Sequence, residues 1–430
     1  MFPWTKDRID MYKQAWLGWS NNGAKIMMRP NFTLAGHCFP IYYAKNFADC
    51  FALAYAHGLI GVDLDSLSGM YATQGPNLYM IARLQSNPDV SPDQVLNEFY
   101  GAFGPASEYI REYFEYLEKI SDNASTGKEK DLIEGGRWVE FFLNADTIFT
   151  AEVFSKCHSI LNKAVHAADG DETTASRVKF LQIGLQNAEL TANTQKYFKK
   201  YESDDRAIID FATSLQRLDK FRQENQKTFF GNIDFMQFAE NRKWPRKMLN
   251  LVNNTTTQLP MRWKFMWDPE KIGEAKKWFN IDFDDNKWRE INVGEFWEKQ
   301  PVGAEWRTRH KRDYDGDAWY RHSFNVPKLN SGDRLYLLFG AVDDSCVIWI
   351  NGQKVVDRPY PFKGNKNSWR DPFEVDITNF IYSNKPNIIA AKVTDSQGFG
   401  GVWKPVFLKI APAPHTGNHA NTKMQVQNNK

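Results

Sequence analysis

The hydrophobic pattern of this chain changes at Pro260, and no single fold accommodates both sides of that change. From about residue 75 to 250, apolar residues recur at three- and four-residue spacing, which is typical of amphipathic helices. After Pro260 the chain consists of short β-branched and aromatic runs, such as RLYLLFGAV, CVIWING and FEVDITNFI. Turn signals separate these runs, NG at 351–352 and SGD at 331–333, so they predict an antiparallel β-sandwich.

A third pattern precedes the helices. KIMMRPNFTLAG, residues 25–36, predicts a short strand that ends near Arg29, because Pro30 cannot donate to a sheet ladder. Residues 40–57 predict a helix that Pro40 can open, and GLIGVDLD, residues 58–65, predicts a second strand. A strand, a helix and a strand in this order form a βαβ unit with parallel strands.

Composition narrows the class of protein. An apolar content of 42% and a charged content of 25% describe a folded chain, and the net charge of +2 does not indicate a nucleic-acid partner. No run of about 18 apolar residues occurs, so we expect no membrane span. The four cysteines form no CxxC pair, which argues against a zinc site and leaves open one bridge, Cys38 to Cys50. The 15 tryptophans suit either sugar binding or aromatic-rich cores.

Polar residues follow both predicted strands of the βαβ unit. Strand alternation places Asp63 and Asp65 on one face, and Arg29 with Asn31 on one face of the preceding strand. Barrel enzymes keep polar site residues at such strand ends, so we predict that these four side chains contact substrate. The structural alternatives are a buried Arg29–Asp63 ion pair and an Asp65 that caps the following loop through backbone N–H groups.

Three further residues of this region are candidates. Gln74 and Asn77, in ATQGPNLY, either contact a ligand or cap the next helix. His37, in the loop after the first strand, either contacts a ligand or is a satisfied structural histidine.

In the sandwich, Trp369 lies in the loop NKNSWRDPF and is the tryptophan we expect to stack on a sugar ring. Trp319 and Trp403 lie in strand-like runs, which favours core packing. Residues 307–317, RTRHKRDYDGD, concentrate five basic residues if His310 is charged. This segment either meets an anionic sugar, such as sialic acid or a uronate, or is a solvated loop.

The region of Asp63 also carries a family resemblance. GVDLDSLSGMYATQGPNLYMIARLQSNPDVSPDQVLNEFYGAFGPA closely resembles the signature of bacterial proteins that carry the domain of unknown function 4838. MMRPNFTLAGH and RVKFLQIGLQNAELT are similar to the segments before and after it, so the resemblance covers roughly residues 10–250. It implies a glycoside hydrolase of endo-β-N-acetylglucosaminidase type, acting on complex N-glycans, whose catalytic (β/α)8 barrel precedes a helical segment.

A second resemblance covers about residues 265–412. FDDNKWREINVGEFWE, DGDAWYRHSFNVP, AVDDSCVIWINGQKV and GFGGVWKPVFL resemble the galactose-binding-like sandwich attached to many glycosidases. This part is similar to the sugar-binding domain of β-galactosidase-type enzymes. The two resemblances are independent, and both imply a glycan or a glycoprotein oligosaccharide as partner.

The patterns and resemblances together predict a multi-domain α/β + α + β fold. A complete barrel takes about 250 residues, whereas only about 75 precede the helices here, so we expect the remainder of the barrel N-terminal to this chain. The expected parts are the last strands of a (β/α)8 barrel at 1–75, a helical domain at 76–255, a galactose-binding-like sandwich at 260–412 and a disordered tail at 413–430.

The leading functional hypothesis is the C-terminal portion of a glycoside hydrolase. Such enzymes use two carboxyl groups that flank the scissile bond, whereas Asp63 and Asp65 would approach a substrate from the same wall. The catalytic acid is therefore expected upstream, and this chain alone is expected to be inactive and to need no cofactor. The alternatives are an α-glucuronidase-like glycosidase and a non-catalytic glycan-binding or surface-structural protein.

The resemblance also implies a periplasmic or extracellular protein. The N-terminal segment MFPWTKDRIDMYKQAW lacks the apolar region of a signal peptide, so the expectation of export rests on the family alone.

Overall fold

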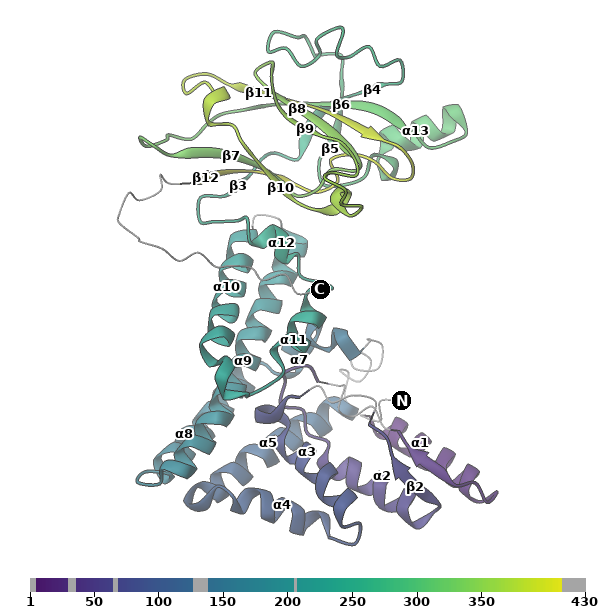
Figure 1. Ribbon diagram of the computed structural model, residues 1–430, viewed down its shortest axis with the longest axis vertical. Coiled ribbons are helices and arrows are strands. Elements are labelled where there is room, and N and C mark those ends of the chain that lie inside the picture. Colours follow the sequence, from purple (N-terminus) through teal and green to yellow (C-terminus); the bar gives the residue numbers. More distant parts are fainter. Residues whose placement is uncertain (1–4, 30–35, 65–68, 127–137, 205–206, 412–430) are drawn as a thin grey trace. The chain divides into compact units, whose positions relative to one another are not determined.

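The computed structural model describes residues 5–29, 36–64, 69–126, 138–204 and 207–411. The chain divides into two compact units, Met1–Pro245 and Arg246–Lys430. The first is helical and contains one small parallel sheet, and the second is an antiparallel β-sandwich (Figure 1).

The first unit has one helix, then a βαβ unit, and continues as a helical bundle. Its elements are α1 (Lys6–Ser20), β1 (Ile26–Met28), α2 (Ala44–Ala56), β2 (Leu59–Val62), α3 (Tyr71–Ser86), α4 (Pro92–Gly101), η2 (Gly104–Ala106), α5 (Ser107–Thr126), η3 (Trp138–Leu143), α7 (Ala145–Ile148), α8 (Ala151–Ala167), α9 (Glu172–Ser203), α10 (Ile208–Asn225), η5 (Gln226–Thr228) and α11 (Ile233–Glu240).

The predicted βαβ unit is present. β1 and β2 pair in parallel, with Ile26 opposite Leu59, and α2 connects them. The helix begins at Ala44 rather than at Pro40, and the neighbouring contacts give the reason. The Asn77 side chain accepts a hydrogen bond from the backbone N–H of Tyr43, so this N–H group is satisfied outside a helix. In the part of the chain that the structure describes, the parallel sheet has two strands, and the wider barrel stays a prediction.

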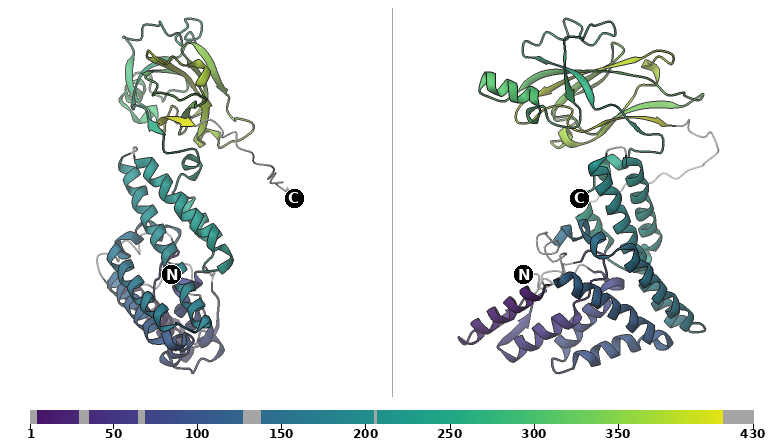
Figure 2. Two further views of the ribbon diagram at one scale, coloured as in Figure 1. Left: turned by 90° about the vertical axis from the view of Figure 1, so that its left-hand side faces the viewer. Right: turned by 180° about the vertical axis from the view of Figure 1, so that it is seen from behind.

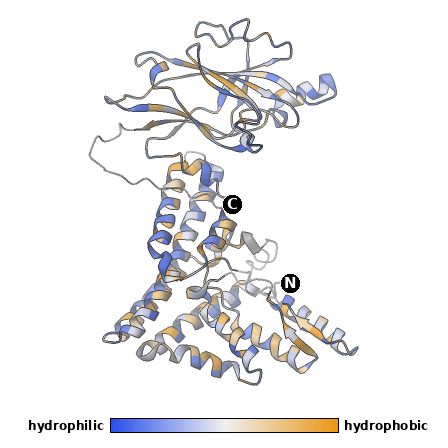
Figure 3. Ribbon diagram, in the orientation of Figure 1, coloured by the Kyte–Doolittle hydropathy of each residue, from blue (hydrophilic) through white to orange (hydrophobic). Residues whose placement is uncertain are grey.

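The longer helices bury apolar residues, and α4, α8, α9 and α11 also begin with a side-chain cap. Ser91 caps α4 by accepting a hydrogen bond from the backbone N–H of Gln94, and Pro92 occupies the first helical position, as the sequence predicts. α5 buries Ile110, Phe114 and other residues on one side. Both hydrophobic and hydrophilic residues colour most of these helices in Figure 3.

The long helix α9 organises the bundle. It packs against α10, α8 and α3, and the pairing of α9 with α10 is visible from several sides in Figures 1 and 2. Gly184 permits the close approach to α3, because a Cβ atom at this position would lie 2.5 Å from Cβ of Ala72. The absence of a side chain at residue 184 therefore sets the spacing of two helices.

The second unit contains the sandwich and a few short helices. Its elements are α12 (Arg246–Leu249), β3 (Thr257–Gln258), β4 (Arg262–Asp268), β5 (Arg289–Asn292), η6 (Trp297–Lys299), α13 (Pro301–His310), β6 (Gly316–Phe324), β7 (Arg334–Phe339), β8 (Ser345–Ile350), β9 (Gln353–Arg358), η7 (Ser368–Arg370), β10 (Phe373–Asp376), η8 (Thr378–Phe380), β11 (Asn387–Asp395) and β12 (Val406–Ala411).

The sandwich prediction is confirmed. A six-stranded sheet in the order β5-β4-β6-β11-β8-β9 faces a four-stranded sheet in the order β10-β7-β12-β3, and all the strand pairs are antiparallel. A continuous apolar core, which includes Phe265, Tyr320 and Leu337, fills the space between the sheets.

The six-stranded sheet is buried on its outer face as well. Strand alternation in β6 sends Tyr320 into the core between the sheets and Trp319 to the opposite side. There Trp319 packs with Trp278, and its indole N–H donates to Asp268 at 2.9 Å. Arg321 on the same face forms an ion pair with Asp285 at 2.8 Å. The segment between β4 and β5 therefore covers this sheet, which explains part of the tryptophan content.

The structure also bears on two other points of the sequence, a membrane span and a disulfide. No described helix is long and apolar enough to cross a membrane. The four cysteines are buried and free, so the bridge between Cys38 and Cys50 that the sequence left open is not formed.

The close approach of α3 and α9 makes a testable prediction. Gly184→Ala forces the new methyl group against Ala72, and overpacking of this kind costs about 1–3 kcal/mol of unfolding free energy. Gly18→Ala is the matched control, because this exposed glycine in α1 has no neighbour within 4 Å of a built Cβ. It should be stabilising by about 0.5–1 kcal/mol, from helix propensity alone. Urea denaturation followed by circular dichroism measures both, and equal effects of the two substitutions would contradict the packing argument.

Candidate functional site

The two predicted strand ends do meet. Arg29 follows β1, Asp63 follows β2, and the guanidinium lies 2.5 Å from the Asp63 carboxylate. The side chains are 57% and 44% exposed, so the expectation that this pair is buried is wrong. Among the residues that the structure describes, the parallel sheet has only these two strands, and this agrees with the exposure of the pair. An exposed pair of this kind contributes about 0–1 kcal/mol to stability.

The other residues predicted to contact substrate here are either undescribed or buried. Asn31 and Asp65 lie outside the described residues. Gln74 and Asn77 are 1% and 0% exposed, and both lie within α3. The Gln74 amide donates to the backbone carbonyl of Phe39 at 3.2 Å, and the Asn77 amide donates to that of Ile41 at 2.7 Å. These two side chains therefore bind the backbone of the segment before α2, and neither caps α3.

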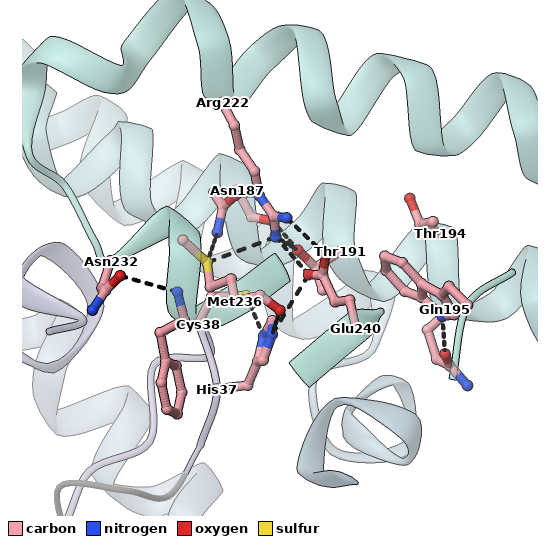
Figure 4. Close-up of polar contacts among 12 residues, drawn as sticks. His37, Cys38, Asn187, Thr191, Thr194, Gln195, Arg222, Asn232, Met236 and Glu240 are labelled. Carbon is pink, nitrogen blue, oxygen red and sulfur yellow. Dashed lines mark hydrogen bonds and ion pairs between the residues drawn. The ribbon is translucent and has the colours of Figure 1, made fainter. Parts of the chain in front are cut away.

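A buried ionic network, which sequence reasoning missed, lies in the middle of the helical unit (Figure 4). Arg222 of α10 donates through both Nη atoms to the carboxylate of Glu240 in α11, at 2.9 and 2.8 Å. Its Nε donates to the Asn187 side chain at 2.8 Å, and Nη2 also donates to the Thr191 hydroxyl at 3.1 Å. The guanidinium and the carboxylate are 1% and 0% exposed, so substrate has no access to this charge pair.

His37 belongs to the same network. Its Nε2 lies 3.3 Å from the carbonyl oxygen of Met236 and 3.5 Å from Glu240. Burial lowers the pKa of His37 to about 4, with the Glu240 carboxylate acting in the opposite direction, so the ring is neutral at pH 7. Of its two interpretations, the structural one holds. No local motif announces the network, because its residues are up to 203 positions apart in the sequence.

An accessible aromatic surface lies at the ends of several sandwich strands. We call Trp369, Trp403, Phe296 and Phe399 the aromatic strip. Trp369 and Trp403 have ring centroids 5.6 Å apart, Trp403 stacks on Phe296 at 4.7 Å, and Phe296 lies 5.4 Å from Phe399. Three of the rings are half-buried, and Phe399 is 49% exposed.

The burial of the three sandwich tryptophans can now be compared with the predictions. Trp369 is partly accessible, as expected of a surface candidate. Trp319 is fully buried, as predicted, in the apolar cluster on the outer face of the six-stranded sheet. The core expectation for Trp403 is wrong, because this residue follows the Gly400–Gly401 turn and precedes β12. Its indole N–H donates to the backbone carbonyl of Trp369 at 3.1 Å, which ties the two loops together.

Four carboxyl groups, Glu298, Asp343, Asp344 and Asp395, lie beside the strip and form what we call the carboxyl cluster; each is at most 8% exposed. Glu298 accepts a hydrogen bond from the backbone N–H of Gly400, and Asp344 accepts from the hydroxyl of Ser396. The segment 395–403 therefore carries part of the cluster as well as two rings of the strip.

The proximity of these carboxyl groups changes their acidity. Burial, followed by the hydrogen bond to Asp344 and the neighbouring charges, raises the pKa of Asp343 to about 9. Burial likewise raises the pKa of Glu298 to about 7 and that of Asp395 to about 6. Among the described residues, no three His, Cys, Asp or Glu side chains form a group that could hold a metal ion.

The basic segment 307–317 is not a single loop. Its first four residues form the last turn of α13, and Arg307 forms an ion pair with Asp313 at 2.6 Å. One of its basic side chains is therefore neutralised within the segment.

Two family models match separate segments of the chain. Residues 256–402 match the model described as "Glycosyl hydrolases family 2, sugar binding domain". Residues 3–115 match the model described as "Domain of unknown function (DUF4838)". Both families that the sequence resembles are therefore matched, the first over residues 3–115 and not over the expected 10–250. An endo-β-N-acetylglucosaminidase is not shown.

Several curated relatives are glycosidases. A β-glucuronidase of Paenibacillus borealis is 29% identical over 137 residues, which cover 31% of this chain and 20% of the relative. The β-galactosidase BoGH2A of Bacteroides ovatus is 25% identical over 148 residues, which cover 33% of this chain and 15% of the relative. The matched part of the chain thus spans a fifth or less of the length of these relatives.

Solved structures give the same partial likeness. A β-glucuronidase of Bacteroides uniformis matches with 24% identity and a TM-score of 0.30, covering 36% of this chain and 18% of that chain. A β-glucuronidase of Ruminococcus gnavus matches with 19% identity and a TM-score of 0.31, covering 38% of this chain and 29% of that chain.

The buried network makes a stability prediction. Glu240→Gln leaves the Arg222 guanidinium buried without its counter-charge, and the loss of one partner of a buried pair costs about 3–5 kcal/mol. Replacing both residues, Arg222→Met with Glu240→Leu, should restore part of that loss. Glu224→Gln is the control, because its pair with Lys220 lies on the same helix but is exposed. Its effect should stay below about 1 kcal/mol in chemical denaturation. Similar losses for Glu240→Gln and Glu224→Gln would contradict a special role for the buried pair.

The carboxyl cluster makes a prediction about pH. Since the pKa of Asp343 is about 9 in the folded state, well above the 3.8 of an aspartate in an unfolded chain, the folded protein holds a proton that the unfolded chain releases. The unfolding free energy should therefore fall as the pH rises from about 4 to 9, by at most about 1.4 kcal/mol per pH unit for this group. Asp343→Asn removes the ionisation and should flatten the curve between pH 5 and 9.

Asp357→Asn is the control for this measurement, because Asp357 is 58% exposed and pairs with Lys354 on the surface. Denaturation monitored by tryptophan fluorescence gives the pH curve of each variant. A curve for Asp343→Asn that runs parallel to that of the unaltered protein would overturn the assignment of the proton to this cluster.

Proposed function

We propose that this chain is the carbohydrate-binding portion of a glycoside hydrolase that acts on glucuronate-containing glycans. The observation that carries the proposal is the match of residues 256–402 to the sugar-binding domain of family 2. The accessible aromatic strip on this sandwich adds independent support, since aromatic side chains present flat apolar faces beside polar groups.

The relatives guide the choice of substrate class. Most of the curated relatives are named β-glucuronidases. This favours the glucuronidase-like alternative over an endo-β-N-acetylglucosaminidase. The sequence alternative is an α-glucuronidase-like glycosidase, whereas these relatives are named β-glucuronidases, and the substrates of the test below distinguish the two bond configurations. The endo-β-N-acetylglucosaminidase hypothesis rests on the resemblance of the first unit alone.

The catalytic carboxyl pair belongs, in this proposal, to a part of the enzyme other than these 430 residues. Asp63 is committed to Arg29 on an exposed edge, and Glu240 is committed to Arg222 in the bundle core. The carboxyl cluster of the sandwich is buried, and its members hydrogen-bond to neighbouring backbone and hydroxyl groups. None of these groups is arranged as an acid and a base on opposite sides of an open cleft.

The test is hydrolysis by the whole natural reading frame that contains this sequence. Three substrates separate the hypotheses: 4-nitrophenyl β-glucuronide, glucuronoxylan with α-linked uronates, and a glycoprotein with complex N-glycans. We expect glucuronate release from one of the first two and none from the 430-residue chain alone. Cleavage of the N-glycan, with both glucuronides left intact, would overturn the proposal in favour of the endo-β-N-acetylglucosaminidase.

A further inference from the structure

We propose that the aromatic strip, together with Lys299, Arg370 and Lys404, is a binding site for uronic acid residues of a glycan chain. The inference rests on the proposed function, and it adds the site and the group that the site recognises. It is carried by the juxtaposition of accessible aromatic rings with three cations.

The rings form one continuous row, in which Phe296 and Trp403 stack face to face while Trp369 and Phe399 are tilted at its two ends. Trp369, Trp403, Phe296 and Phe399 follow one another with successive centroid distances of 5.6, 4.7 and 5.4 Å. The ring faces that this stacking leaves uncovered, among them that of the 49% exposed Phe399, are apolar and suit the C–H face of a pyranose. A surface that is several rings long suits an oligosaccharide better than a single sugar.

Each part of the strip carries a cation above it. The ammonium of Lys299 lies 5.6 Å from the ring centre of Phe296 and 5.5 Å from that of Phe399. The ammonium of Lys404 lies 4.9 Å from the Trp403 ring, and the guanidinium of Arg370 lies 5.9 Å from the Trp369 ring. The three side chains belong to exposed residues.

These cations are available for an anionic partner. Within the ranges that the structure describes, Lys299, Arg370 and Lys404 form no ion pair with a carboxylate, in contrast to Arg321 and Lys247 of the same unit, which pair with Asp285 and Asp371. A cation above an aromatic ring is held near the ring by about 0.5–1 kcal/mol at an exposed site, which is little enough for a carboxylate to compete.

The acidic groups nearby do not cancel this charge. Asp371 is committed to Lys247 at 2.8 Å, and the pKa of the buried Glu298 is raised to about 7, so its negative charge is incomplete at neutral pH. Asp343 is held in its neutral form by a pKa of about 9. Asp344 and Asp395, the other members of the carboxyl cluster, accept hydrogen bonds from Ser396 and from the backbone N–H of Gln397. Glu295 is an exposed acidic neighbour in sequence.

The proposed contacts combine two kinds of interaction. The sugar ring lies on the aromatic strip, and its C6 carboxylate accepts hydrogen bonds from the ammonium or guanidinium groups. Charge-assisted hydrogen bonds of this type are roughly twice as strong as neutral ones. A neutral glucose unit keeps the stacking and loses the charged contact.

The experiment compares two tetrasaccharides that differ only at C6. The full 430-residue chain is titrated calorimetrically with β-1,4-linked tetraglucuronate and with cellotetraose, its neutral counterpart. We expect binding of tetraglucuronate to be about tenfold tighter, which corresponds to about 1.4 kcal/mol, and to weaken as salt is added. Lys299→Gln with Lys404→Gln should remove this preference, whereas Phe399→Ala should weaken the binding of both sugars.

Arg309→Gln is the matched control, because Arg309 is an exposed cation of the same sandwich, on α13, and lies outside the strip. It should leave both affinities unchanged. Thermal unfolding of each variant shows whether the sandwich stays folded. We expect it to stay folded, because the substituted side chains are exposed.

Three results would overturn the inference. These are equal affinities for the two sugars, no binding of either, and a preference for tetraglucuronate that survives the double lysine substitution. The proposed function is judged separately by glucuronate release from the whole enzyme, so it can stand when the strip fails. If the whole enzyme cleaves only N-glycans while the chain still prefers tetraglucuronate, the strip stands and the proposed function fails.

Discussion

The helical unit depends on how the positive charge of Arg222 is accommodated. A guanidinium that is 1% exposed is stable only if its counter-charge and its hydrogen-bond acceptors are fixed around it. Glu240 supplies the charge, while Asn187 and Thr191 supply oxygens, so α9, α10 and α11 must come together in one arrangement. His37 brings the segment before α2 to the same point. One buried charge thus connects the parallel strands with the bundle.

A corresponding constraint governs the sandwich, where the six-stranded sheet is covered on both faces. The core between the sheets takes one set of alternating side chains, and the segment between β4 and β5 takes Trp319 and Arg321. The broad faces of this sheet are therefore used for stability. What remains for recognition is the set of loops at the strand ends, where the aromatic strip lies. This division, in which packed strands position loops that bind, is common to many β-sandwiches.

The candidate residues show where sequence reasoning succeeds. Trp369 lies in a turn-rich loop, and such loops are exposed because their backbone needs water, so its accessibility could be predicted. Its neighbours in the strip could not, because Phe296 and Phe399 come from loops about 70 and 30 residues away. Gln74 and Asn77 were predicted as polar site residues by type and position. Their amide groups instead donate to backbone carbonyls of the segment before α2, which has no helical hydrogen bonds of its own. The local sequence does not reveal this pairing.

The sequence by itself determined the classes of structure and their order: a βαβ unit, a helical bundle and an antiparallel sandwich. Hydrophobic spacing and turn residues act over short distances, so a window of about ten or twenty residues is enough to recognise each class of structure. Only the tertiary structure decided that Arg29 and Asp63 meet in the open, that Arg222 and Glu240 meet in the core, and that four aromatic rings share a surface. These are contacts between distant segments, and their formation depends on the free energy of packing the whole unit rather than on any local pattern.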